Sequence, residues 1–107
     1  MRRSTLLGIA ASTTLLIFTG QAYGADPAAG ETLYASNCAQ CHGPTGKGMA
    51  SFPSLAGREA SYIQSRLETY RAGEKVGPNS GLMIPNARNL SDDDIANLSA
   101  FISSSFK

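Results

Sequence analysis

Every cysteine and histidine of this 107-residue chain lies in the run Cys38-Ala39-Gln40-Cys41-His42. Residues three and four apart lie on the same face of a helical turn. Cys38 and Cys41 are therefore expected to present their sulfurs side by side, with the His42 imidazole on the same side. Five residues can then supply two covalent bonds and one coordination bond to a single bound group, which strongly constrains the fold around them.

A C-x-x-C-H run is the attachment signature of c-type haem. Other uses of the same residues fit the sequence less well. A thioredoxin-like C-x-x-C requires a βαβ context, which the sequence lacks. A structural zinc site requires four ligands, so a carboxylate would have to be the fourth, and a simple disulfide leaves His42 without a role. We therefore expect Cys38 and Cys41 to hold one haem c covalently, and His42 to bind its iron.

The first 24 residues have the order of a secretory signal peptide. Arg2 and Arg3 form a basic start, residues 6–18 are uncharged and mainly apolar, and Ala22-Tyr23-Gly24 places small residues before a cleavage site at Ala25. A membrane anchor would need about 20 apolar residues, so no stable membrane insertion is expected after cleavage. The expected organisation is a signal peptide over residues 1–24 and one domain over residues 25–107. The domain is expected in the periplasm, with the thylakoid lumen or another extracytoplasmic space as alternatives.

Length and charge exclude several classes of protein. A chain of 107 residues is too short for two ordinary domains. Its 9 Lys and Arg against 8 Asp and Glu lack the positive excess that is typical of nucleic-acid binding, so no nucleic-acid partner is expected. Two cysteines are too few for a disulfide framework. A domain of this size gains much stability from a bound cofactor.

The sequence predicts an all-α fold with three main helices and a long loop. Asp26 and Pro27 are typical of an N-cap and a first helical position, so a helix is expected to begin there. Residues 43–57 hold four Gly and two Pro and predict an irregular segment. A second helix is predicted from about Glu59 to Ala72, where apolar residues recur at helical spacing.

The third helix has the clearest predicted start. Ser91 is expected as its N-cap, with Asp94 reaching back as in a capping box, and Leu90 and Ile95 forming a hydrophobic staple. No sustained strand alternation occurs elsewhere in the chain. Residues 73–89, rich in Gly, Pro and Asn, are expected to form a long loop, and loops of this length are usually functional or disordered.

The chain resembles the class I cytochromes c, and among them the small bacterial monohaem carriers of the c4, c5 and c553 kind. The resemblance extends over nearly all of residues 26–104. It implies one haem enclosed by about three main helices and a long ligand-bearing loop. It rests on Cys38-Ala39-Gln40-Cys41-His42-Gly43, Gly46-Lys47-Gly48, Pro53-Ser54-Leu55-Ala56-Gly57, and Met83 followed by Leu90-Ser91-Asp92-Asp93-Asp94-Ile95.

The resemblance also implies roles for three residues outside the C-x-x-C-H run. In this family the first and last helices cross near the haem edge at a small residue, which Gly30 matches, with Phe101 as a suitable aromatic partner. A family proline offers its carbonyl to the imidazole that binds the iron, and Pro53 matches that position. Such a bond would fix the His42 tautomer and raise its basicity.

Three methionines are candidates for the second axial ligand. Met1 belongs to the predicted signal peptide. Met49 follows His42 too closely to reach the opposite side of a haem easily, so ordinary core packing is expected for it. Met83 lies beyond a predicted helix and a turn-rich stretch, and it precedes Leu90 by the same spacing as the ligand Met of the family. Since His/Met ligation is usual in cytochromes c, Met83 is the expected ligand.

Ligation by His42 and Met83 would leave no open position on the iron. No second histidine is present to act as a general base, so we expect no catalytic residues and no enzyme activity. The expected function is that of a soluble one-electron carrier, which docks transiently with redox protein donors and acceptors outside the cytoplasm. Two alternatives stay open. In the first, the chain is a haem subunit of a larger oxidoreductase. In the second, Met83 does not bind iron and the chain is a gas- or peroxide-binding haem protein.

Overall fold

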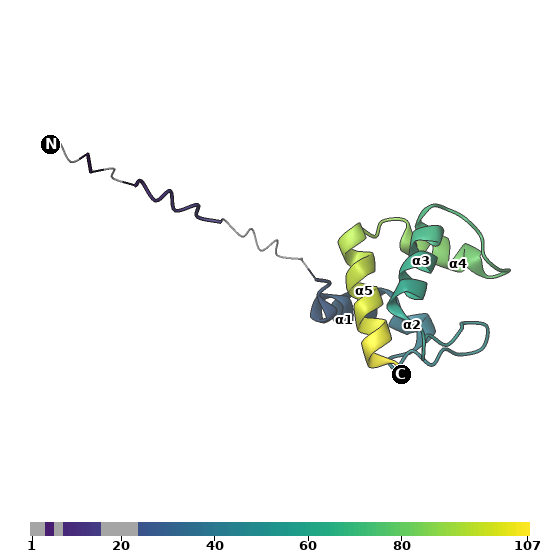
Figure 1. The fold of residues 1–107 in the computed structure, drawn as a ribbon. Coiled ribbons are helices and arrows are strands. Elements are labelled where there is room, and N and C mark those ends of the chain that lie inside the picture. Colours follow the sequence, from purple (N-terminus) through teal and green to yellow (C-terminus); the bar gives the residue numbers. More distant parts are fainter. Residues whose placement is uncertain (1–3, 6–7, 16–23) are drawn as a thin grey trace.

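A computed structural model describes residues 4–5, 8–15 and 24–107 (Figure 1). The predicted signal peptide over residues 1–24 lies in large part outside the described residues, so its cleavage stays a prediction. No helix within the described ranges is long and apolar enough to cross a membrane. The same ranges contain five helices and, in place of any strand, one isolated bridge between Met49 and Phe52. The prediction of an all-α fold is confirmed.

Helix α1 (Pro27–Asn37) begins where the sequence predicted. The Asp26 carboxylate accepts hydrogen bonds from the backbone N–H groups of Ala28 at 3.0 Å and Ala29 at 3.3 Å. Pro27 takes the first helical position, where its missing N–H would have had no partner in the helix. The cap therefore fixes the start of the helix that leads directly into the C-x-x-C-H run.

Helix α1 crosses helix α5 (Asp92–Ser105) at Gly30 (Figure 1). A Cβ atom on Gly30 would overlap the carbonyl oxygen of Asn97 and would lie 3.0 Å from the Cβ of Phe101. Only a residue without a side chain allows the two backbones to approach this closely. The structure thus places Gly30 and Phe101 at the helix crossing, as the resemblance implied.

The start of α5 also agrees with its prediction. The Ser91 hydroxyl accepts a hydrogen bond from the Asp94 backbone N–H, and the Asp94 carboxylate accepts one from the Ser91 N–H, both at 3.0 Å. An aspartate therefore completes the capping box in place of the usual Glu or Gln. Asp92 forms a 2.8 Å ion pair with Arg71 at the end of helix α3 (Ala60–Arg71).

The core lies where α1, α3 and α5 meet. Ile63 and Leu67 on α3 are buried against the apolar face of α5, as the helical spacing of these residues predicted. Seven buried residues form one cluster: Tyr34, Ile63, Leu67, Ile95, Leu98, Ile102 and Phe106. Partly buried apolar side chains, Leu33, Leu55 and Leu90 among them, pack around this cluster.

Residues 73–89 do not form the continuous loop that was predicted, because helix α4 (Ser80–Ala87) lies within them. Packing against α3 and local hydrogen bonds stabilise this helix despite its Gly, Pro and Asn content. The Ser80 hydroxyl is buried and accepts hydrogen bonds from the backbone N–H groups of Val76 and Gly77, each at 2.8 Å. Ala87 is fully buried at the other end. Pro85 has no backbone N–H and so removes one hydrogen bond of the helix. The helix ends two residues later, at Ala87.

The C-x-x-C-H run forms the one-turn helix α2 (Ala39–His42), which follows α1 directly, with Cys38 capping both helices. Residues 43–57 then fold back beneath α2 without helix, as predicted. Gly48 permits this return, because its φ is +73° and a Cβ there would meet the backbone of Pro53. The loop thereby brings Pro53 next to His42.

Candidate functional site

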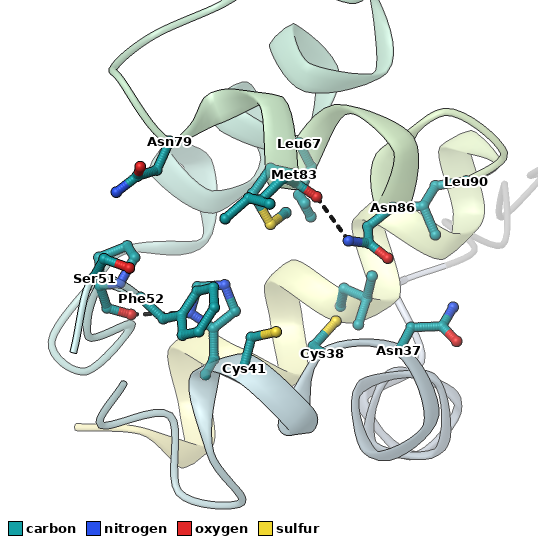
Figure 2. Close-up of a pocket in the computed structure, with 14 residues that line it drawn as sticks. Asn37, Cys38, Cys41, Ser51, Phe52, Leu67, Asn79, Met83, Asn86 and Leu90 are labelled. Carbon is teal, nitrogen blue, oxygen red and sulfur yellow. Dashed lines mark hydrogen bonds between the residues drawn. The ribbon is translucent and has the colours of Figure 1, made fainter. Parts of the chain in front are cut away.

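An apolar cavity lies between α2 and α4 (Figure 2). The space between its lining residues, together with the part that is open to solvent, measures about 660 Å³. A second cavity of similar size adjoins it on the side of α3. Both are lined by Cys38, His42, Pro53, Leu67, Met83 and Leu98. Since six residues line both, the two cavities lie side by side next to the C-x-x-C-H run.

The two cysteines lie on the α2 side of this space, with their sulfurs beside each other (Figure 2). Neither forms a disulfide. Burial, together with the neighbouring Cys41, raises the pKa of the Cys38 thiol to about 11. A reactive redox thiol has a lowered pKa, so the environment of Cys38 argues against the thioredoxin-like reading.

His42 is buried, and its Nδ1 atom lies 2.9 Å from the carbonyl oxygen of Pro53. A carbonyl oxygen can only accept, so this contact requires the proton to be on Nδ1. The Nε2 lone pair is then free to bind a metal. The structure therefore places Pro53 where the resemblance implied, and it fixes the tautomer of an imidazole that lines the cavity.

Met83 lies on α4, across the cavity from the two cysteines, and its sulfur points into the space (Figure 2). The structure thus gathers all four predicted site residues around one cavity. Met49 does not line that cavity, and its side chain is 53 % exposed. The prediction that Met49 packs in the core was therefore wrong, because its loop runs along the surface and leaves it in solvent.

Tyr34 is a site residue that the sequence analysis did not assign. Its side chain is 2 % exposed, and its hydroxyl donates a 2.6 Å hydrogen bond to the carbonyl of Gly43, the residue after His42. Burial, and then the nearby Cys38, raises the pKa of Tyr34 to about 12. In the sequence, its burial could have been predicted from its position one helical turn after Gly30, on the face that packs against α5.

Three polar side chains at the cavity's edge were also not assigned from the sequence. Asn37, Asn79 and Asn86 line the first cavity (Figure 2), and the Asn86 amide donates to the Leu82 carbonyl at 2.8 Å. Arg58 and Tyr62 line the second cavity. The Arg58 and Arg66 guanidinium groups lie 4.8 and 5.2 Å from the centre of the Tyr62 ring. The neighbouring Arg66 and Arg58 guanidinium groups lower the pKa of Tyr62.

The donor groups around the cavity fit haem. Two thiols and one imidazole nitrogen lie on one wall, a thioether lies on the opposite wall, and apolar side chains such as Leu67 and Leu98 lie between them. A flat apolar ring with a metal at its centre matches this set. Within the described part of the chain, no three Cys, His, Asp or Glu side chains are placed to hold a bare metal ion, so the zinc reading finds no support.

Comparisons with known proteins agree with this site. A model of the family described as Cytochrome c matches residues 27–106. Cytochrome c-554(548) of Halomonas halodenitrificans is 45 % identical over 80 residues, covering 74 % of this chain and 95 % of that protein. Cytochrome c-554(547) of Halothiobacillus neapolitanus is 42 % identical over 85 residues, covering 72 % and 93 %.

Among solved structures, reduced cytochrome c4 from Pseudomonas stutzeri is similar with a TM-score of 0.68 and 33 % sequence identity. The match covers 78 % of this chain and 50 % of that one. The chain therefore spans about half the length of this structural neighbour, whereas it spans nearly the whole length of the two c-554 proteins.

Proposed function

We propose that this chain, which belongs to the cytochrome c family, is a diffusible one-electron carrier. In this proposal, His42 and Met83 are the axial ligands of its haem iron. Proteins of this family are haem-based electron carriers with covalently attached haem c, and Cys38, Cys41 and His42 stand in the arrangement that holds it. One observation carries the proposal. The Met83 sulfur faces the cavity from the wall opposite Cys38 and Cys41 (Figure 2).

When bound, haem c supplies a reversible one-electron Fe(II)/Fe(III) couple. The chain's own groups adjust that couple. The Pro53 carbonyl holds the His42 imidazole in one tautomer and raises its basicity. The Met83 thioether favours the reduced iron and so raises the potential. The apolar side chains lining the cavity limit the access of water.

With both axial positions filled, the protein would offer no open site to a substrate or gas. This favours electron transfer over enzyme catalysis, and it agrees with the electron-carrier relatives of the chain. The partners proposed are redox proteins that dock transiently. Such encounters usually bury less than about 1,200 Å² of surface.

We also propose that residues 1–24 are a signal peptide, that residues 25–107 are the single haem-binding domain, and that the domain works in the periplasm. Cleavage before Ala25 would leave the first helix cap intact. Asp26 would keep its bonds to α1, and its backbone N–H would still donate to the Asn97 side chain at 2.7 Å.

Carbon monoxide binding by the reduced holoprotein tests the proposed ligation. We expect the unmodified protein to bind carbon monoxide slowly or not at all near neutral pH, since Met83 occupies the position that the gas would need. Met83→Ala should bind it rapidly and should have a lower potential. Met49→Ala is the matched control and should behave like the parent, because Met49 lies outside the cavity. Rapid binding by the unmodified protein would instead favour the gas-binding alternative.

A further inference from the structure

The loop over residues 43–57 is attached to the surrounding fold at both of its ends. At one end, the Tyr34 hydroxyl donates to the Gly43 carbonyl at 2.6 Å. At the other, the Gly57 backbone N–H donates to the Phe106 carbonyl at 2.8 Å. Among the described residues, these are the hydrogen bonds that join the loop to α1 and to the chain after α5. Together with the Gly48 N–H, which donates to the His42 carbonyl at 2.8 Å, Tyr34 and Phe106 therefore hold the loop beneath His42.

Phe106 contacts the loop in a second place as well. It follows the end of α5, is 8 % exposed, and has its ring centre 5.0 Å from that of Tyr34 and 5.4 Å from that of Phe101. Its ring lies directly against the backbone of Gly46, where any Cβ would overlap it. One residue thus holds the loop by its side chain at Gly46 and by its carbonyl at Gly57.

These two contacts lie on either side of the proline that orients His42. The Gly46 carbonyl accepts a 2.7 Å hydrogen bond from the Leu55 N–H. Leu55 is two residues after Pro53, whose carbonyl oxygen is 2.9 Å from the His42 Nδ1 atom. A movement of Gly46 or Gly57 would therefore move the segment that contains the Pro53 carbonyl.

We propose that Phe106 is a positioning residue for the axial imidazole, because it clamps Gly46 and Gly57 and so holds the Pro53 carbonyl against the His42 Nδ1 proton. The inference rests on the proposed role of His42 as an iron ligand. Groups that orient a metal-binding histidine strongly affect its donor strength. An aromatic residue beyond the last helix would thus act on the iron through a loop, without touching the haem itself.

Nuclear magnetic resonance on the reduced, nitrogen-15-labelled holoprotein tests this proposal through the His42 Nδ1 proton. In Phe106→Ala we expect that proton to exchange with solvent about tenfold faster, as local opening of the loop becomes easier. Its resonance should also move in the direction of a weaker hydrogen bond. Both variants keep the backbone hydrogen bond to Gly57, so they test the contact of the ring with Gly46. Phe106→Leu, which keeps a smaller apolar contact there, should lie between Ala and the parent. It provides the same comparison if the Ala variant does not fold.

Phe101→Ala is the matched control, because Phe101 belongs to the same aromatic cluster, whereas the ring that lies against Gly46 is that of Phe106. In Phe101→Ala, the exchange of the His42 Nδ1 proton should accelerate no more than the loss of global stability accounts for. Equal effects of the Phe101 and Phe106 variants, after correction for stability, would overturn the inference, as would an unchanged Nδ1 resonance in both Phe106 variants. A parent protein whose iron is not bound by His42 would instead contradict the proposed function.

Discussion

Gly30 determines how closely α1 and α5 approach, and so where the C-x-x-C-H run lies relative to the core. Its missing side chain leaves room for the Asn97 carbonyl oxygen, and the Phe101 side chain closes the crossing from the side. Since α2 follows α1 directly, a change in the spacing of the helices would also move Cys38 and Cys41. One residue in the first helix therefore affects the geometry of a site located two turns later.

Gly30→Ala should destabilise the holoprotein, although alanine is the better helix former. The new methyl group must push α1 away from α5, and overpacking of this kind typically costs about 1–3 kcal/mol. Gly81→Ala is the matched control, because Gly81 is also helical and a Cβ there meets no atom within 4 Å. It should stabilise by roughly 0.5 kcal/mol. Chemical unfolding of both variants measures the difference, and equal stabilities would show that the crossing tolerates a side chain.

At the scale of whole elements, α4 shows what the sequence could not predict. The helices with strong local signals, the Asp26-Pro27 start and the Ser91 capping box, begin where they were predicted. Helix α4 has no such signal. Asn79 does not cap it with its side chain, and Pro85 lies inside it. The bonds from the preceding turn to Ser80 and the burial of Ala87 stabilise it, and the burial exists only in the folded chain.

The residues of the site likewise fall into those that the sequence could predict and those that it could not. The four residues around the cavity could be predicted, because C-x-x-C-H has a fixed spacing and few methionines were available. The role of Tyr34 could not, since its hydroxyl bonds to a carbonyl whose position depends on the path of the loop. Met49 was misplaced for a related reason. Composition identifies a loop but does not say which of its side chains face solvent.

Ser80→Ala should weaken the attachment of α4 and of the turn before it. The variant leaves the Val76 and Gly77 N–H groups without their partner, and the loss should cost about 1–2 kcal/mol. Amide exchange at these two residues should accelerate more than exchange in α1. Ser103→Ala removes a hydroxyl that bonds only within α5, so it should leave the exchange of α4 unchanged. Equal effects of the two substitutions would mean that Ser80 does not hold the helix.

At the scale of the whole molecule, the protein has a small core and a large internal space. The core cluster contains seven buried residues, and two of its leucines, Leu67 and Leu98, also line the cavity. Part of the small core is thus also the wall of the space that would enclose a cofactor. Folding and haem binding are therefore expected to be strongly coupled.

The haem-free chain should consequently be largely unfolded. Cys38→Ala combined with Cys41→Ala removes the attachment points and allows the polypeptide to be prepared without haem. Far-ultraviolet circular dichroism of that variant should show much less helix than the holoprotein, and no cooperative melt. Native-like helicity with a cooperative transition would show that the core cluster suffices by itself.

The central claim is that Met83 binds the iron opposite His42, and the methionine methyl resonances of the reduced holoprotein test it most directly. A methyl group held over the centre of the porphyrin experiences the ring current and moves far upfield. With carbon-13-labelled methionine methyl groups, we expect one such resonance, which is lost in Met83→Ala and kept in Met49→Ala. Ordinary shifts for both methyl groups, or an upfield resonance that disappears with Met49, would contradict the account.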